Sequence, residues 1–172
     1  MLLRTFCIYS ILCCFTILLT ACVTRHYFYS TTPIIEMAHG RILTRVFHYY
    51  NNEKDSTKYL EKGGTMVTIG FDYYPEAISN EEVELTADSI MIYFPNSQIR
   101  KDLSASDYLT LLYGGSKRLL LDSLIVPKED FKRFELSLLF TAFKKSDGSI
   151  LDKQHLNMEI FHRKEREIYW GK

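Results

Sequence analysis

The alternation of bulky apolar residues with mostly smaller or polar ones is the feature that most limits what this chain can fold into. It is clearest over residues 65–74, and Pro75 follows directly after them. Large apolar side chains occupy every second position there: Val67, Ile69, Phe71 and Tyr73. Because successive side chains of a β-strand point to opposite faces, this period of two predicts a strand with one buried face.

The same period recurs along the chain between turn signals. Further strands are predicted at residues 41–50, 83–94, 117–126, 133–143 and 155–162. Within 83–94 the apolar residues change from odd to even positions around Asp88 and Ser89, which predicts a β-bulge or a tight turn between two short strands. Loops or turns are predicted at residues 51–57, 62–64, 128–131 and 146–149.

One stretch departs from this pattern and predicts a short helix over residues 104–113. Residues 104–107 are of the capping-box type. Leu109, Leu112 and Tyr113 would then share one helical face, and the glycine pair 114–115 would supply a left-handed stop.

The aromatic residues 27–29 stand shortly before Pro33. Proline confines a strand here to a sheet edge or divides it into two pieces. A first edge strand is the prediction, and an aromatic belt at a membrane surface is the alternative, because tyrosine has an apolar body and a polar tip.

These patterns predict an all-β fold. The chain holds 12 Tyr and 11 Phe, residue types that favour strands. Uneven intervals between the predicted strands favour an antiparallel β-sandwich, immunoglobulin-like in outline, over a small β-barrel. Residues 27–172 are predicted to form a single domain. All four cysteines lie at or before Cys22, so this domain must be stabilised by its core rather than by disulfides.

The beginning of the chain has the layout of a secretory signal peptide. Arg4 precedes an apolar run over residues 6–19, and small residues follow. Leu19-Thr20-Ala21-Cys22 resembles the lipobox of bacterial lipoproteins. The resemblance implies removal of residues 1–21, lipidation of Cys22 and a short tether over residues 22–26. An uncleaved membrane anchor is the alternative.

The resemblance also implies a location in the cell envelope. Val23, rather than aspartate, follows the cysteine, which in enteric-type lipoproteins implies the outer membrane, with the domain on its periplasmic face. In a bacterium with a single membrane the protein would instead be located at the cell membrane. Several acyl chains on Cys22 would hold the protein on the membrane essentially permanently.

The charge balance and the spacing of the histidines disfavour a nucleic-acid partner and a zinc site. After residue 21 the chain carries 20 basic and 21 acidic side chains, which does not suit a nucleic-acid partner. Four basic pairs are expected at solvated strand ends: Arg100-Lys101, Lys117-Arg118, Lys132-Arg133 and Lys144-Lys145. The histidines have no zinc-site spacing, although His48 and His162 could approach each other: His26, His39, His48, His155 and His162.

No hydrolase motif is evident. Ser116 follows two glycines but lies in the wrong context for a nucleophile. Glu81, Glu82, Glu84 and the pair 129–130 are candidate carboxylates by proximity alone. We therefore expect no enzyme and no cofactor, and predict a non-catalytic envelope lipoprotein that contacts another envelope protein through a sheet edge or an aromatic surface. A carrier or sensor of a small apolar ligand is one alternative, and a hydrolase without a visible motif is another.

Overall fold

The structure is a computed structural model and describes residues 22–48 and 64–168. The chain divides into two compact units, which are described separately. One unit is Phe28–Arg163. The other comprises Met1–Tyr27 and Lys164–Lys172, in which the described residues are the beginning of the first strand and the end of the last one.

The described residues form ten strands and three short 3₁₀ turns. The strands are β1 (Cys22–Ser30), β2 (Ile34–Glu36), β3 (Gly40–His48), β4 (Gly64–Pro75), β5 (Val83–Phe94), β6 (Ile99–Leu103), β7 (Tyr108–Tyr113), β8 (Ser116–Pro127), β9 (Arg133–Lys144) and β10 (Ile150–Ile168). The turns are η1 (Asn80–Glu82), η2 (Ala105–Asp107) and η3 (Lys128–Asp130).

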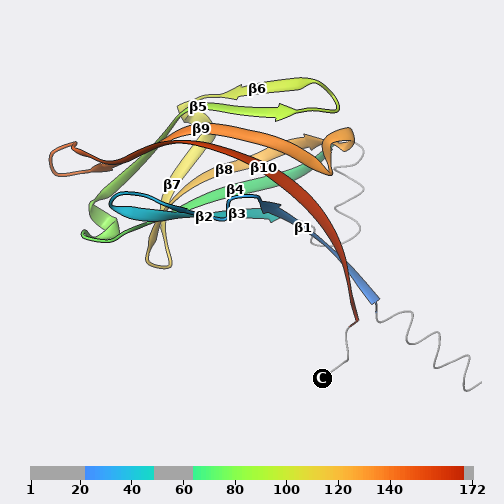
Figure 1. Ribbon diagram of the computed structural model, residues 1–172, viewed down its shortest axis with the longest axis horizontal. Coiled ribbons are helices and arrows are strands. Elements are labelled where there is room, and N and C mark those ends of the chain that lie inside the picture. Colours follow the sequence, from blue (N-terminus) through green and yellow to red (C-terminus); the bar gives the residue numbers. More distant parts are fainter. Residues whose placement is uncertain (1–21, 49–63, 169–172) are drawn as a thin grey trace, which may run out of the picture. The chain divides into compact units, whose positions relative to one another are not determined.

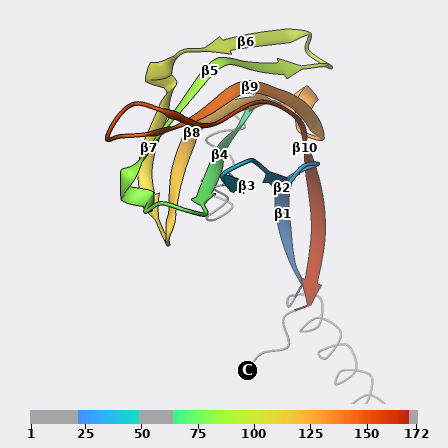
Figure 2. The same cartoon turned by 60° about the vertical axis from the view of Figure 1, so that its left-hand side comes forward.

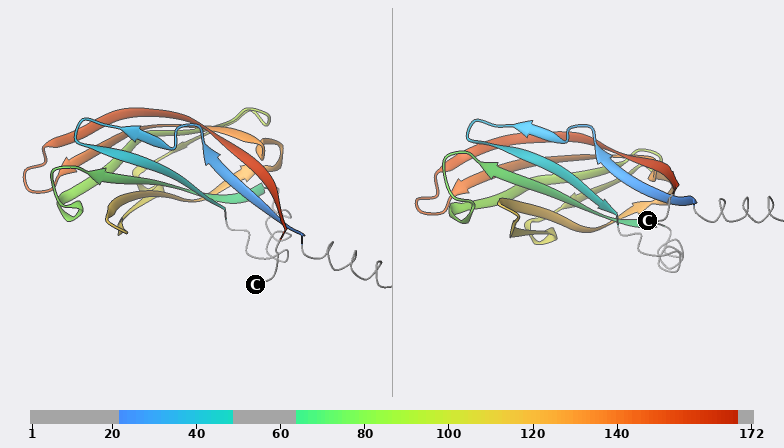
Figure 3. Two further views of the ribbon diagram at one scale, coloured as in Figure 1. Left: turned by 60° about the horizontal axis from the view of Figure 1, so that its bottom comes forward. Right: turned by 90° about the horizontal axis from the view of Figure 1, so that it is seen from below.

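The strands form two five-stranded sheets. Sheet 1 has the order β1-β10-β9-β5-β6, and sheet 2 has the order β2-β3-β4-β8-β7. In Figure 1 sheet 1 is the upper layer and sheet 2 the lower one, and both can be followed again in Figure 3. The predicted all-β sandwich is confirmed, and the small-barrel alternative is wrong, because the strands form two separate sheets rather than one closed one.

The alternation predicts which side chains fill the core. On β4 the side chains of Val67, Ile69, Phe71 and Tyr73 are fully buried. Rings from the two sheets meet between the layers, with the centroids of Tyr73 and Phe140 5.9 Å apart. Burial of such large apolar side chains is the main stabilising contribution to the fold.

The phase shift in β5 is a β-bulge, the first of the two predicted alternatives. Pairing of β5 with β9 shifts register between Asp88 and Met91, and Ser89 has φ 49°. Because the bulge adds a residue, the apolar side chains before and after it all face the core: Val83, Leu85, Ala87, Ile90, Ile92 and Phe94.

The helix predicted over residues 104–113 is wrong. Only η2 is helical, and β7 follows it as an edge strand of sheet 2. The capping interaction exists, since the Asp107 carboxylate accepts a hydrogen bond from the Ser104 N–H at 2.6 Å. However, Gly114 and Gly115 have φ of 52° and 83° and connect β7 to β8 as a two-residue hairpin turn.

Proline acts as predicted at the start of the domain. The chain forms β1 before Pro33 and β2 after it, and the two strands are edges of different sheets. The first edge strand is therefore confirmed. Backbone of residues 22–26, predicted to be a tether, belongs to β1. The predictions for residues 1–21 and 51–57 lie outside the described residues.

One buried polar group connects the two sheets. Asp152 of β10 accepts hydrogen bonds from the Tyr73 hydroxyl at 2.6 Å and from the His39 backbone N–H at 3.1 Å. Burial, followed by the hydrogen bond to Asp152, raises the pKa of Tyr73 above its ordinary value. Tyr73 is therefore a neutral donor that holds sheet 2 against sheet 1.

Candidate functional site: the outer face of sheet 2

The outer faces of the two sheets differ in chemistry. On sheet 1 the outward residues are mostly polar, and Arg133 forms ion pairs with Glu159 at 2.5 Å and Glu135 at 3.1 Å. Five of the eight large apolar side chains that are exposed in the described residues belong instead to strands of sheet 2: Ile34, Leu109, Leu112, Tyr113 and Ile125. Apolar surface is thus concentrated on sheet 2.

One row of residues crosses all five strands of sheet 2. The pairing registers place five side chains side by side on its outer face, in the order Ile34, Leu43, Asp72, Arg118 and Leu111. Residues directly opposite each other on neighbouring strands face the same side of the sheet. The row is therefore apolar toward its two ends and charged in the middle.

The centre of this face is a cluster of three charged side chains, Arg45, Asp72 and Arg118. Asp72 is fully buried and pairs with Arg118 through both carboxylate oxygens, with Nη2–Oδ2 at 2.8 Å. Arg45 Nε lies 2.9 Å from Asp72 Oδ2. Hydrogen bonding to Asp72 raises the pKa of Arg118 above its ordinary value. Two cations around one carboxylate leave the cluster with a net charge of about +1.

Aromatic rings enclose Arg118. Its guanidinium carbon lies 3.6 Å from the centroid of Tyr113 and 5.3 Å from that of Phe47. This stacking, together with the pairing to Asp72, keeps Arg118 only 5% exposed. Arg45 is different, because 42% of its side chain is open to solvent.

We call the outward residues around this cluster the sheet 2 face. It consists of Ile34, Leu43, Arg45, Phe47, Asp72, Leu109, Leu111, Tyr113, Arg118 and Leu120. Arginine and tyrosine among aliphatic side chains, with few lysines or glutamates, is the composition typical of protein-binding surfaces. Arg45 is the exposed charged group at the centre of this face, and the outward, exposed Glu36 and Arg41 lie nearer one end of the β2–β3 pair.

Sequence reasoning missed this cluster and the burial of Arg118. The Lys117-Arg118 pair was expected at a solvated strand end. Arg118 is indeed the third residue of β8, but it is buried against Asp72 and Tyr113 rather than solvated. One signal was present in the sequence. Asp72 is the only charged residue in the run 65–74, and a carboxylate in such a strand requires a cationic partner.

Two of the candidate catalytic groups, Asp130 and Ser116, form hydrogen bonds with nearby backbone groups. Asp130 is buried because it accepts hydrogen bonds from the N–H groups of Asn96 and Ser97 at 2.6 and 3.1 Å. Ser116 donates to the Tyr113 carbonyl at 2.7 Å. Asp130 therefore stabilises the turn at residues 96–97, and Ser116 stabilises the turn between β7 and β8. In the described part of the chain, no three His, Cys, Asp or Glu side chains are grouped for metal binding.

Two predicted positions are described only in part. Cys22 is the first residue of β1, and its side chain is outside the description, as is that of His48. His162 lies with its ring centroid 4.3 Å from that of Phe131. No helix among residues 22–48 and 64–168 has the length and apolar character needed to cross a bilayer.

Among the surface hollows lined by described residues, two lie on the outside of the sheets. One lies on the outer face of sheet 1 beside Met91, Ser137 and Asn157. The other lies beside the turn between β7 and β8, next to Asn80 and Leu112. Both are open to solvent.

Comparisons with known proteins show no relative by sequence. No protein-family model matches the chain, and no curated protein matches it. Among solved structures, the chain is similar to FetP of uropathogenic Escherichia coli strain F11, "as isolated" and recombinantly expressed in the periplasm, with a TM-score of 0.43 and 7% identity over 79% of this chain and 95% of that one. A copper-bound variant of FetP from the same strain matches with a TM-score of 0.39 and 7% identity, over 86% and 94% of the two chains. Likeness at this level carries no information on function.

Proposed function

We propose that this protein is a lipid-anchored, non-catalytic module of the bacterial envelope that binds another envelope protein through the sheet 2 face. Two independent features support the proposal. The lipobox-like Leu19-Thr20-Ala21-Cys22 supports the anchor, and the sheet 2 face supports the binding. The observation that carries the binding is the exposed Arg45 at the centre of an apolar face, with its carboxylate partner already shared with Arg118.

The chemistry of the face specifies the partner. Its aliphatic and aromatic side chains would be covered by an apolar patch of similar size. Arg45 keeps guanidinium N–H groups beyond the one that points at Asp72, and these would bind an acidic side chain in a bidentate pair. The partner is therefore an envelope protein with a carboxylate in the middle of an apolar surface.

The anchor is tested by replacing Cys22 with alanine in the full chain. Cys22→Ala is expected to leave an unprocessed precursor without lipid, because the sulfur atom that receives the acyl group is lost. Processing is read from the mass of the chain, and lipidation from incorporation of a labelled fatty acid. Cys14→Ala is the matched control, since it removes a thiol from the expected signal peptide and should change neither result. Normal processing of Cys22→Ala would refute the anchor.

The binding surface is tested by charge reversal. Arg45→Glu should reduce recovery of the partner in crosslinked pulldowns from membranes at least tenfold, because it places a carboxylate against the partner's carboxylate. Arg133→Glu is the control, as Arg133 is a similarly exposed arginine on the outer face of sheet 1. Equal loss with both variants, or no loss with either, would contradict the proposal.

A further inference from the structure

The four edge strands among the described residues are protected to different degrees. On β6 the residues Arg100, Lys101 and Asp102 place charges on the edge. β2 is three residues long and follows Pro33, and β1 carries Arg25 and His26 in its sequence. Charges, proline and short length are the devices that keep an edge strand from pairing with another chain.

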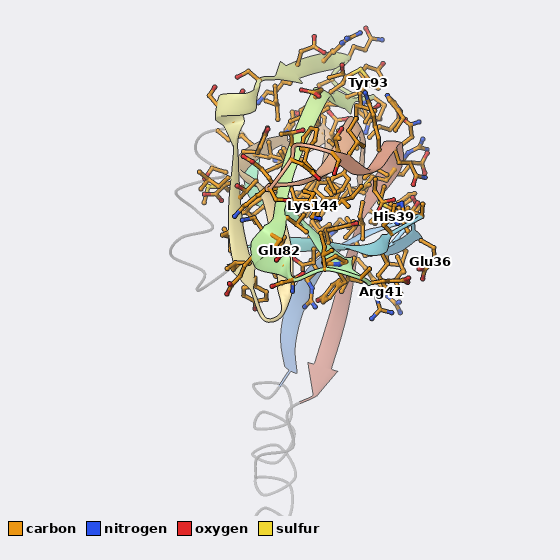
Figure 4. All side chains as sticks on the ribbon, turned by 90° about the vertical axis from the view of Figure 1, so that its left-hand side faces the viewer. Glu36, His39, Arg41, Glu82, Tyr93 and Lys144 are labelled. Carbon is orange, nitrogen blue, oxygen red and sulfur yellow. The ribbon has the colours of Figure 1, made fainter. Side chains whose placement is uncertain are left out.

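β7 has none of these protections. Its six residues are Tyr-Leu-Thr-Leu-Leu-Tyr, without charge, proline or glycine. Leu109, Leu112 and Tyr113 are 58%, 52% and 49% exposed. Figure 2 shows β7 and β2 on opposite sides of sheet 2, and in Figure 4 the labelled Glu36, His39 and Arg41 lie on the β2 side, away from β7. An uncharged, apolar and exposed edge strand is a template for pairing with a further strand.

We propose that β7 pairs in antiparallel fashion with β7 of a second copy of this chain, so that sheet 2 continues across a twofold axis. This inference goes beyond the proposed function, because it concerns the sheet edge rather than the face and does not require the lipid anchor. A twofold pairing brings the same strand against itself, so that every residue must tolerate its symmetry mate.

Strand geometry limits the possible registers. Backbone N–H and C=O groups alternate between the two sides of a strand, so two residues that face each other are separated by an even number of positions in the sequence. With the axis at Leu111, Leu109 faces Tyr113 and Thr110 faces Leu112. With the axis at Thr110, Leu109 faces Leu111 and Tyr108 faces Leu112.

Both registers give matched pairs. All facing side chains are apolar or neutral, and aromatic or aliphatic pairs across strands stabilise a sheet. No like charges oppose each other. The same self-pairing at β6, with the axis at Lys101, would bring the two Lys101 side chains together, which repels, although Arg100 would face Asp102. β7 is therefore the long, uncharged edge that can pair with its own copy without opposing like charges, and a second copy is the inferred partner.

A new cysteine at the axis tests the pairing in the full chain in whole cells, treated with a membrane-permeable thiol oxidant. Residues facing each other have Cα atoms about 4.5 or 5.5 Å apart, within the range of roughly 4.4–6.8 Å that a disulfide requires. Leu111→Cys or Thr110→Cys should therefore give a crosslinked dimer, according to which residue lies on the axis. Lys101→Cys on β6 and the native chain, with its four early cysteines, are the controls.

A second variant separates pairing from folding. Leu109→Lys, added to the crosslinking variant, should lower the dimer yield at least tenfold, because it brings a charge into an apolar pair. Ile125→Lys changes a residue of β8 away from the edge, 48% exposed against 58% for Leu109, and should leave the yield unchanged. Near-ultraviolet circular dichroism verifies that both variants are folded.

The proposal is overturned if folded Leu111→Cys and Thr110→Cys both remain monomeric, if Lys101→Cys crosslinks as well as they do, or if they crosslink only to a different protein. Its failure is distinguishable from failure of the proposed function. The dimer is read from disulfide formation at β7, whereas the anchor is read from processing at Cys22 and the partner from recovery with Arg45→Glu.

Discussion

At the scale of single residues, Asp72 explains why charge can lie in the middle of an apolar sheet face. A buried carboxylate is tolerated only when cations and hydrogen bonds replace its water. Arg118 provides two contacts and Arg45 a third. The two arginines differ in exposure, and this difference leads to a prediction.

Arg118→Met should destabilise the fold more than Arg45→Met. Loss of Arg118 leaves Asp72 buried with one exposed partner, and removing one side of a buried ion pair costs about 3 kcal/mol. Loss of the 42% exposed Arg45 should cost about 1 kcal/mol or less. The measurement is the free energy of unfolding in urea. Equal losses for the two variants would show that Arg118 is not the principal partner.

Tyr73 predicts a loss of stability at alkaline pH. The pKa of Tyr73 is raised in the folded state, whereas an unfolded tyrosine titrates near pH 10. A raised folded pKa contributes stability that is complete below pH ~10 and is lost as the pH rises further, because the unfolded chain then releases a proton that the folded one retains.

Comparison with Tyr73→Phe isolates this effect. At pH 8 the variant should be less stable by about 1–2 kcal/mol, since it loses the hydrogen bond to Asp152. Between pH 10 and 11 the difference from the native chain should shrink, because phenylalanine does not ionise. Urea unfolding across this range measures the difference, and Tyr93→Phe on the outer face of sheet 1 is the control. A difference that is constant with pH would contradict the argument.

At the scale of elements, the turn between β7 and β8 shows how two glycines specify a hairpin. Gly114 and Gly115 have φ of 52° and 83°, and a Cβ added at either would meet nothing within 4 Å. Any effect of substitution is therefore due to the backbone. Two-residue hairpin turns with positive φ prefer asparagine followed by glycine.

The two glycines should consequently respond differently. Gly114→Asn should keep the free energy of unfolding within a few tenths of a kcal/mol, because asparagine tolerates a left-handed φ. Gly115→Ala should lower it by about 1 kcal/mol, because alanine at φ 83° is strained. Chemical denaturation of both variants provides the measurement, and reversal of this order would exclude the turn geometry.

At the scale of the whole molecule, the first and last strands of the unit Phe28–Arg163 lie beside each other. The Thr31 N–H donates to the Glu159 carbonyl at 3.0 Å, although 128 positions separate the two residues in the chain. In sheet 1, β10 lies between β1 and β9 rather than at an edge. The end of the chain is therefore part of the core, through Leu156, Met158 and Ile160.

Truncation tests this arrangement. A chain of residues 28–163 should remain folded, because all the buried apolar side chains of the described residues belong to it. A chain of residues 28–149 should fail to fold, because it lacks β10 and exposes the inner face of β9. Near-ultraviolet circular dichroism and protease resistance distinguish the two. A folded 28–149 chain would show that β10 is dispensable.

The sequence by itself determined where most strands lie and which side chains face inward. Period-two alternation placed β4 and β9 and the bulge in β5, and Pro33 separated β1 from β2. These are local properties, because backbone geometry fixes the alternation and proline lacks an N–H.

Tertiary structure decided which strands pair and what lies on each outer face. The apolar spacing in residues 108–113 fits a helix as well as a strand, and pairing with β8 selected the strand. Similarly, Asp72, Arg45 and Arg118 are brought together by register between β3, β4 and β8. The physical reason is that pairing between strands joins residues far apart in the chain, whereas alternation acts between neighbours.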